Sequence, residues 1–373
     1  MKKLILTCIL SLSLLVASSP VSALESKTTS VTLSSGKKAV TYVLFHPSEP
    51  LELKPVLAHN KVGLTEELAK MAQRNQAVAA INGTFFNPYD TKDLQPLGAL
   101  AINQRMEHFR GGPVALGITQ QNELWFDATK SIAIRGSING SEVWPHNWYA
   151  WFINHAPTSQ DEIVIFTPSY RSAQLDFPQF SFVVVNDGKV TSISKNKATI
   201  PAKGFVIAYG SNPTNQDQLQ RFQVGDTVSY QVVYPDGIGS PQHLLSAGPK
   251  LVTNGKISLD SAGFTEDKIT KNPGQRSFIG MKADQTILFG TVSNVTMKEL
   301  AQLVIKLGLT EAMNLDGGAS SGLYYNGKYL TKPGRLLSNS LVLVKKEKIQ
   351  APAIQVMING VPQRYDQRST SAI

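Results

Sequence analysis

Apolar residues recur with a helical period in two separate stretches of the chain. Residues 63–75 place Thr65 at the expected N-cap position, with two glutamates in the first turn and one apolar face. Residues 296–307 begin with a capping box, formed by Thr296 and Glu299, and carry a leucine- and valine-rich stripe that stops before a glycine. The periodicity therefore predicts two amphipathic helices.

Most of the remaining chain alternates between apolar and polar residues or consists of short β-branched runs, which is typical of strands. Asn-Gly and Asp-Gly pairs separate several of these runs and predict hairpin turns at residues 186–189, 253–256 and 326–327. The expected strands lie at residues 31–46, 77–81, 182–185, 190–193, 204–209, 227–234, 244–257, 276–289 and 340–344, with further short strands between 97 and 181. We therefore predict an α+β fold, in which two principal helices pack on a β-rich mixed sheet.

Each predicted helix is followed by an apolar strand that ends in a polar turn. The N-cap and the asparagine of the turn are 17 residues apart in the first unit, from Thr65 to Asn82, and 18 apart in the second, from Thr296 to Asn314. We interpret this spacing as a repeated helix–strand–turn unit. The hypothesis predicts that Asn82 and Asp316 meet at one cleft.

The first 23 residues have the organisation of a secretory signal peptide. Lys2 and Lys3 precede an apolar core from Leu4 to Ala17, and a small-residue cleavage motif ends at Ala23. The apolar core is too short and too often interrupted by serines to span a membrane itself. We also expect no membrane span in the chain that remains after the leader is removed. The only cysteine lies inside this core, which leaves the mature chain without disulfides or thiolate chemistry. These features predict a bacterial protein that is secreted or associated with the cell wall.

Basic residues outnumber acidic ones, 36 to 27, and give a formal net charge of +9. This balance favours anionic partners at a cell surface, either a phosphorylated carbohydrate or an anionic cell-wall polymer. No run of lysines and arginines is dense enough to predict nucleic-acid binding. The composition does not determine the oligomeric state.

The most distinctive stretch reads N-L-D-G-G-A-S-S-G, from Asn314 to Gly322. After an apolar run it presents one carboxylate, two glycines and two serines, namely Asp316, Gly317, Gly318, Ser320 and Ser321. Adjacent glycines permit positive φ, and successive backbone N–H groups in such a turn form an anion-binding concavity. The set suits a sugar or a phosphate. The structural alternative is a glycine-rich hairpin that the aspartate caps.

Aromatic residues gather in two other places. The segment Asn82-Gly83-Thr84-Phe85-Phe86 follows the predicted strand at 77–81, and its two phenylalanines could form a platform on which a sugar stacks. Three tryptophans, Trp144, Trp148 and Trp151, fall within a few residues of one another. A turn in the first case and a packed core in the second are the common alternatives.

Several familiar motifs match only in part. Residues 318–322 satisfy G-x-S-x-G, but a hairpin follows and all six histidines lie upstream, which excludes a serine-hydrolase elbow. Residues 322–328 satisfy G-x-x-x-x-G-K, but Tyr329 stands where a P-loop needs Ser or Thr. There is no zinc motif, and we predict no cofactor. A weaker alternative is Ca²⁺ at the oxygen ligands of Asn87, Asp90 and Asp93, whose spacing fits no standard loop.

Together these blocks resemble the phosphodiester glycosidase family, relatives of the enzyme that uncovers mannose 6-phosphate on lysosomal hydrolases. The matching blocks are Asn82–Phe86, Ser246–Pro249 with Leu251-Val252, Arg276 with Ile279-Gly280, Met297–Ala301, Asn314–Ser321 and Arg335–Val344. We place the domain at residues 30–345, followed by a basic tail, 346–373, that resembles the opening of a copper amine oxidase N-terminal-like domain. The chain departs from the family at Thr84 and Ala319, where glycines are usual, and at Thr291–Val295, where an acidic Asp-Gly-Arg segment is common.

The resemblance implies hydrolysis of a sugar-1-phosphodiester to a free sugar and a phosphomonoester. It implies catalytic roles for Asp316, Asn82 and Arg276, and substrate binding by Gly83, Phe86, Gly248, Gly317, Gly318, Ser320, Ser321, Arg335 and Asn339. The two arginines would clamp the phosphate, because a guanidinium offers bidentate donors. Asp316 would act as a base or electrostatic stabiliser, while the asparagines would orient the sugar or a water molecule.

Two other classes of protein remain open. A non-catalytic module that binds glycans or teichoic acids would use the same cleft without releasing a phosphomonoester. A structural surface protein would use the aspartate turn only to shape its chain, and Asp316→Asn would then alter stability alone. The substrate sugar and its aglycone do not follow from the sequence.

Overall fold

The computed structural model describes residues 24–91, 94–112, 114–127, 132–235, 241–261 and 263–346, together with two strands, β26 (Val356–Ile358) and β27 (Val361–Gln363), that pair with each other. Strands make up 51% and helices 11% of the described residues. The predicted signal peptide, Asp93 and most of the basic tail lie outside these ranges. No helix within them is long and apolar enough to cross a membrane.

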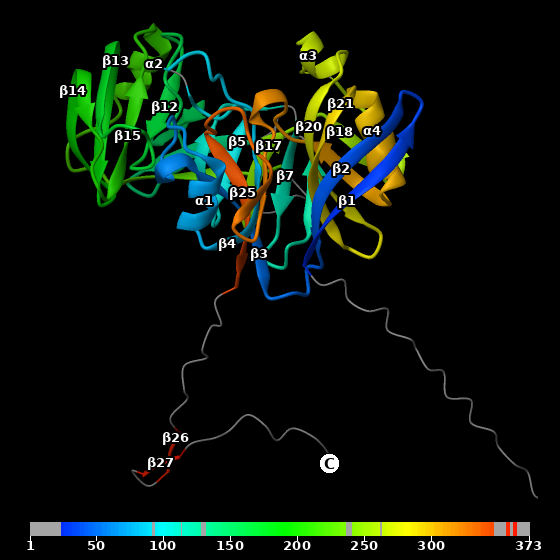
Figure 1. The fold of residues 1–373 in the computed structure, drawn as a ribbon. Helices are drawn as coiled ribbons and strands as arrows, with labels where there is room; N and C mark the ends of the chain where they lie inside the picture. The colour runs from blue at the N-terminus through cyan, green and yellow to red at the C-terminus, as the bar shows by residue number, and fades with distance from the viewer. Residues whose placement is uncertain are drawn as a thin grey trace, which may run out of the picture.

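The strands form four sheets apart from the β26–β27 hairpin. A seven-stranded sheet has the order β1 (Glu25–Leu33), β2 (Gly36–Phe45), β21 (Ile287–Val295), β20 (Gly274–Lys282), β22 (Leu309–Asn314), β18 (Lys250–Thr253) and β19 (Lys256–Ile257). A five-stranded sheet has the order β24 (Lys328–Thr331), β23 (Leu323–Tyr325), β4 (Ala77–Asn82), β25 (Asn339–Lys345) and β3 (Leu51–Leu57). In both sheets the described pairs are antiparallel. Strands from distant parts of the chain lie side by side, since β2 pairs with β21 and β3 pairs with β25 (Figure 1).

The other two sheets use the middle of the chain. The ten-stranded sheet has the order β14 (Lys189–Thr199), β13 (Gln174–Asn186), β15 (Gly204–Tyr209), β12 (Ile163–Phe166), β11 (Phe152–Ile153), β6 (Arg105–Phe109), β5 (Ala99–Ile102), β17 (His243–Ala247), β7 (Val114–Ile118) and β8 (Leu124–Asp127). The three-stranded sheet has the order β10 (Asn147–Ala150), β9 (Ala133–Ile138) and β16 (Val228–Val233). Figure 1 shows β13 to β15 at one end of the molecule, with β1, β2 and α4 at the other.

Helices are few and short in the described residues. They are α1 (Leu68–Arg74), α2 (Pro213–Leu219), α3 (Asp267–Thr270) and α4 (Met297–Lys306), with 3₁₀ turns η1 (Ala58–Asn60) and η2 (Gly318–Ser320). The prediction of an α+β fold with two principal helices on one sheet is therefore wrong, and the fold is predominantly β. The helices α1 and α4 exist, but they pack on different sheets: α1 on the five-stranded sheet and α4 on the seven-stranded one.

The two helices also differ in how they begin. α4 starts with the predicted capping box, in which Thr296 and Glu299 bond each other's backbone N–H groups. α1 starts at Leu68 without a side-chain cap, so the predicted cap at Thr65 is wrong. The chain before α1 is held extended because Glu66 exchanges backbone hydrogen bonds with Leu337. A tertiary contact thus shortens the helix.

The main core lies between three of the sheets. It is formed by side chains such as Phe45, Ile81, Leu116, Phe289 and Leu341, which come from the seven-, five- and ten-stranded sheets. A second core joins the ten-stranded and three-stranded sheets and includes Trp148 and Tyr209. The predicted tryptophan core is only partly correct, because Trp148 is buried while Trp144 and Trp151 are exposed.

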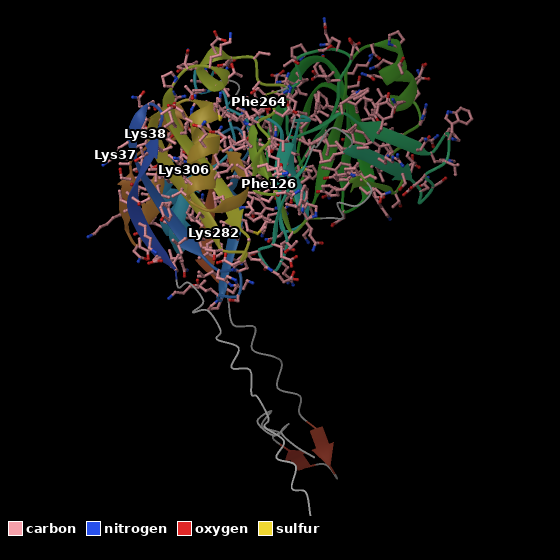
Figure 2. The ribbon with its side chains drawn as sticks, turned by 90° about the vertical axis from the view of Figure 1, so that its right-hand side faces the viewer. Lys37, Lys38, Phe126, Phe264, Lys282 and Lys306 are labelled. Atoms are coloured by element: carbon pink, nitrogen blue, oxygen red, sulfur yellow. The ribbon has the colours of Figure 1, made fainter. Side chains whose placement is uncertain are left out.

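Basic side chains spread over the outside of the molecule. Figure 2 shows Lys37, Lys38, Lys282 and Lys306 around the end formed by β1, β2 and α4. Two of them also serve local structure, since Lys38 Nζ donates to the Asn294 carbonyl and Lys306 Nζ to the Thr32 carbonyl.

Candidate active site

The turn after β22 is fixed by backbone and side-chain bonds at each step. The N–H of Asp316 donates to the Gly83 carbonyl at 3.1 Å, which joins this turn to the one after β4. The carboxylate of Asp316 accepts the N–H of Gly317 at 2.8 Å. Gly318 has φ +60°, a conformation that glycine adopts without strain, and it opens the 3₁₀ turn η2. The glycine pair therefore lets the chain fold back around the carboxylate.

Asn82 supports this turn from below. Its Nδ2 donates to the Asp316 carbonyl at 2.6 Å, and its Oδ1 accepts from Ser277 Oγ at 2.7 Å and from the Gly322 N–H at 3.0 Å. The two residues therefore meet as predicted, although they are 234 positions apart, but they do not share a cleft. Asn82 is buried, however, and does not line the cavity described below. The geometry makes it a positioning residue.

Asn339 supports the neighbouring turn in the same manner. Its Oδ1 accepts the N–H of Thr84 at 2.9 Å, and its Nδ2 donates to Ser338 Oγ at 2.8 Å. A Cβ at Gly83 would lie 2.0 Å from Asn339 Oδ1, so any larger residue here would displace the amide that holds Thr84. Neither Asn339 nor Gly83 lines the cavity. Both hold the chain that underlies it.

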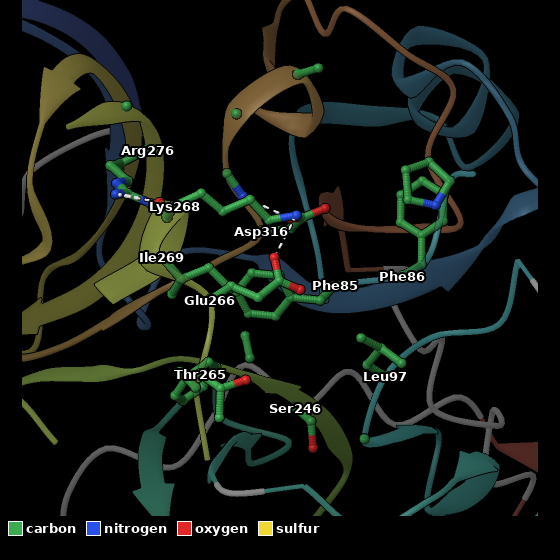
Figure 3. Close-up of a pocket in the computed structure, with 18 of the residues that line it drawn as sticks. Phe85, Phe86, Leu97, Ser246, Thr265, Glu266, Lys268, Ile269, Arg276 and Asp316 are labelled. Atoms are coloured by element: carbon green, nitrogen blue, oxygen red, sulfur yellow. Dashed lines mark hydrogen bonds and ion pairs between the residues drawn. The ribbon is translucent and has the colours of Figure 1, made fainter. Parts of the chain in front are cut away.

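A cavity of about 560 Å³ opens above these turns (Figure 3). Of the residues predicted from the sequence it brings together six: Phe86, Arg276, Asp316, Gly317, Gly318 and Arg335. The cavity is not lined by the other six, which are Asn82, Gly83, Gly248, Ser320, Ser321 and Asn339. Residues that the sequence did not indicate also line it, among them Arg110, Phe264, Glu266 and Lys268.

Asp316 lies at the centre of the cavity, and burial raises the pKa of its carboxyl to about 7. Four groups act in the opposite direction and stabilise the ionised form: the Ser320 hydroxyl, the Gly317 N–H and the charges of Arg335 and Lys268. Burial outweighs them. A carboxyl with such a pKa exchanges a proton near neutral pH, which is the property that acid–base catalysis requires.

Arg276 is buried and its guanidinium is used by the protein itself. It donates to the carbonyls of Val295, Lys268 and Asn272 at 3.2, 3.0 and 2.6 Å. No carboxylate lies within ion-pair distance of it in the described part of the chain, and burial lowers its pKa. Arg276 thereby anchors the segment that contains α3 to the end of β21. Its third nitrogen, Nη1, lies beside Gly317 and remains directed toward the aspartate turn.

Two further cations flank Asp316. The guanidinium of Arg335 lies 5.4 Å from the ring centroid of Tyr89 and donates to its hydroxyl at 3.4 Å, which holds it at the rim. Lys268 projects from α3 and forms an ion pair with Glu266 at 2.6 Å. The residues around α3 show no periodic pattern in the sequence, so nothing there indicated that Lys268 and Glu266 would reach the site.

The cavity is also lined by aromatic and apolar residues. Phe85 and Phe264 lie with ring centroids 6.0 Å apart at 55°, and Leu97 and Ala247 lie nearby. Phe86, which the sequence indicated as a sugar platform, is largely buried against α1, so Phe85 has the more accessible ring. The cavity therefore combines charged side chains with aromatic and apolar ones.

The remaining predicted residues shape the walls. Gly248 has φ +127°, and a Cβ there would lie 2.7 Å from Val114 Cγ1 and 2.8 Å from Phe264 Cζ, so only glycine fits. The Ser320 hydroxyl bonds the Asp316 carboxyl. The Ser321 hydroxyl is buried and has no hydrogen-bond partner among the described residues.

A metal site does not emerge from the described residues. They contain no group of three or more histidine, cysteine or acidic side chains placed to hold an ion. Of the candidate calcium ligands, Asn87 accepts the N–H of Tyr89 through its Oδ1, and Asp93 is outside the described ranges. The calcium hypothesis gains no support from this geometry.

Comparison with known proteins supports the resemblance seen in the sequence. Residues 180–344 match the model of the phosphodiester glycosidase family, which confirms that resemblance. A zebrafish N-acetylglucosamine-1-phosphodiester α-N-acetylglucosaminidase catalytic domain, auto-inhibited by its pro-peptide, is also similar, with a TM-score of 0.48, 14% identity and coverage of 88% of this chain and 85% of that one. None of the curated proteins matches the chain significantly.

Two bacterial structures share the fold. A hypothetical protein from Synechocystis superposes with a TM-score of 0.73 at 23% identity, over 88% of this chain and 64% of that one. A Burkholderia pseudomallei protein thought to be exported superposes with a TM-score of 0.67 at 20% identity, over 83% of this chain and 74% of that one. The chain thus spans less than two thirds of the Synechocystis protein.

Proposed function

We propose that this protein, whose residues 180–344 match the phosphodiester glycosidase family, hydrolyses a sugar-1-phosphodiester to a free sugar and a phosphomonoester. The observation that carries the proposal is the position of Asp316. Its carboxyl has a pKa of about 7 and lies in a cavity between cationic side chains and an aromatic wall. The cationic side chains suit the phosphate of the substrate, the aromatic residues suit its sugar ring, and the carboxyl suits hydrolysis of the bond between them.

In this mechanism Asp316 is the general base. Its ionised form takes a proton from water, the water oxygen bonds to C1 of the sugar, and the C1–O bond to phosphate breaks. The phosphomonoester departs with the electron pair and is already a good leaving group, so a strong general acid is not required. Because the base must be ionised, we expect kcat/KM to rise with pH up to about 7 and then to level off.

The phosphate binds among the cationic side chains that line the cavity. Arg335 and Lys268 supply positive charge, and Nη1 of Arg276 adds a donor beside Gly317. These groups also stabilise the negative charge that grows on the leaving phosphate in the transition state. The sugar or the aglycone packs on Phe85 and Phe264, since the faces of pyranose rings are apolar.

The proposal also covers location. The N-terminal leader pattern predicts export, and one protein of the same fold is itself thought to be exported. We therefore propose that the substrate is a phosphorylated carbohydrate or anionic polymer outside the cell. Expression of the full chain with mass analysis of the secreted form tests this: a product that starts after residue 23 is expected, and an intact intracellular chain would contradict it.

The decisive experiment for the reaction is hydrolysis in H₂¹⁸O, followed by ³¹P and ¹H NMR. The methyl phosphodiester of N-acetylglucosamine-1-phosphate and a bacterial cell-wall extract that contains sugar-1-phosphodiesters would serve as substrates. We expect a free sugar that contains the label and a phosphomonoester that lacks it, which shows cleavage of the C1–O bond. Label in the phosphate would instead identify a phosphodiesterase.

The matched variants are Asp316→Asn and Asp187→Asn. Asp187 is an exposed turn residue of the β13–β14 hairpin, so its substitution changes charge without touching the cavity. We expect Asp316→Asn to abolish hydrolysis and Asp187→Asn to preserve it. Binding of the phosphodiesters by the wild type without any product would support the alternative of a glycan-binding module.

A further inference from the structure

The three-stranded sheet has one face in the core and the other in solvent. Its inner face places Trp148 against Phe205, Phe222 and Tyr230, and a Cβ at Gly136 would lie 1.9 Å from the Trp148 ring. Side chains alternate along a strand, so the neighbours of Trp148 on β10 point outward. The side chains of the inner face thus pack against one another, and this packing does not require the aromatic residues on the outer face.

The outward side carries two exposed aromatic rings. Tyr149 is 38% exposed, and Trp151, directly after β10, is 52% exposed. Their ring centroids are 5.5 Å apart and their planes meet at 83°, so together they form a corner rather than a stack. The loop before β10 exposes two more large apolar side chains, Val143 and Trp144. A cluster of exposed apolar side chains commonly marks a binding surface, because contact between such side chains and water is unfavourable.

Polar side chains stand beside these rings. The strand register places Arg135 of β9 opposite Tyr149 of β10 and Gln231 of β16. Both Arg135 and Gln231 are exposed, and Gln231 Nε2 donates to Glu142 Oε1 at 3.2 Å. Within the described ranges Arg135 forms no ion pair. The face therefore offers ring surfaces with hydrogen-bond donors next to them.

We propose that this outer face is a glycan-binding platform for a polysaccharide of pyranose sugars, separate from the catalytic cavity. The apolar face of a pyranose ring fits the Tyr149–Trp151 corner, while its hydroxyls meet Arg135 and Gln231. A purely apolar partner would bury the guanidinium of Arg135 without a hydrogen-bond acceptor, which is unfavourable, whereas sugar hydroxyls can accept its N–H groups. None of these residues lines the cavity. The platform would hold the protein on a polymer while the cavity acts on another group.

Affinity electrophoresis of the purified full-length mature protein tests the proposal. The gels would contain hydroxyethyl cellulose, xylan or pullulan as soluble probes. We expect at least one probe to retard the wild type, and Tyr149→Ala and Trp151→Ala each to weaken retardation by about tenfold in affinity, since an aromatic ring contributes about 1.4 kcal/mol. Trp151→Phe should retain most of the binding.

Controls separate this site from the catalytic one and from effects on folding. Tyr89→Ala removes an exposed tyrosine at the cavity rim, and it should leave retardation unchanged, as should Asp316→Asn. Circular dichroism would confirm that each variant is folded. No retardation of the wild type by any probe, or equal retardation of the alanine variants, would overturn the proposal. So would a wild-type dimer in sedimentation that Trp151→Ala converts to a monomer, because the face would then join two copies of the chain.

Discussion

The two helix–strand–turn units follow one local plan but end in different roles. In the first, α1 and β4 lead to Asn82; in the second, α4 and β22 lead to Asn314. Each asparagine uses its Nδ2 to hold a turn from elsewhere: Asn82 bonds the Asp316 carbonyl and Asn314 bonds the Gly248 carbonyl, at 2.6 and 2.7 Å. Only the second unit continues into a carboxylate that lines the cavity. The first supports the site, while the second carries its chemistry.

The largest expected effect separates these roles directly. We expect Asp316→Asn to lower kcat/KM by about 10³-fold or more, because the general base is lost while the fold is kept. The measurement is the NMR assay beside a denaturation curve. A variant that keeps its activity would contradict the chemical role of the second unit.

Asn82→Ala should act mainly on stability. It leaves the Asp316 carbonyl, Ser277 Oγ and the Gly322 N–H without their partner in a buried place, so we expect a loss of about 3 kcal/mol in the free energy of unfolding. Asn314→Ala removes one described bond and should cost about 1–2 kcal/mol. Urea denaturation of both variants measures the difference. Equal losses would show that the two asparagines do not differ as supports.

The pH dependence of stability sharpens the same contrast. The pKa of Asp316 in the folded state, about 7, is above its value in the unfolded chain. At pH values between these two pKa values the folded state binds more protons than the unfolded state, so the stability of the fold falls as pH rises from about 4 to 7. We expect this carboxyl to account for a loss of about 2 kcal/mol over that window, after allowance for its partial exposure. Asp316→Asn should therefore be more stable than the wild type at pH 8 and nearly equal to it at pH 4. A variant less stable at pH 8 would contradict the burial effect.

The smallest expected effect concerns the helix caps. Thr296→Ala breaks the capping box of α4 and should cost about 1 kcal/mol. Thr65→Ala lies before a helix that has no side-chain cap and should change stability by less than about 0.5 kcal/mol. Thermal unfolding compares them. Similar losses of stability in the two variants would contradict this difference, because Thr65 would then stabilise the fold as much as the capping threonine does.

The sequence predicted the features that depend on neighbouring residues. The capping box at Thr296, the hairpin turn at Asp187-Gly188 and the meeting of Asn82 with Asp316 are confirmed, because each rests on short patterns or on a repeat of them. The division into sheets could not be predicted in the same way. β2 pairs with β21, more than half the chain away, and such register depends on packing that one sequence does not display.

The candidate site shows the same limit. The aspartate turn was predicted from its glycines, and the structure places it in the cavity. Lys268 and Phe264 were missed, because they come from a segment whose position depends on Arg276. Asn82 was predicted to be catalytic and Asn339 to bind the substrate, but both are buried and their amides bond the protein chain instead.

The anchoring by Arg276 bears on how this cavity can diverge among related proteins. Its guanidinium holds the α3 segment through main-chain oxygens alone, at Lys268 and Asn272. Every residue type has such an oxygen, so the side chains of this segment are free to vary while their backbone stays in place. Phe264, Glu266 and Lys268 all project from it into the cavity. Substrate preference can therefore evolve by point substitutions on a fixed loop, without loss of the base or of the frame that holds it.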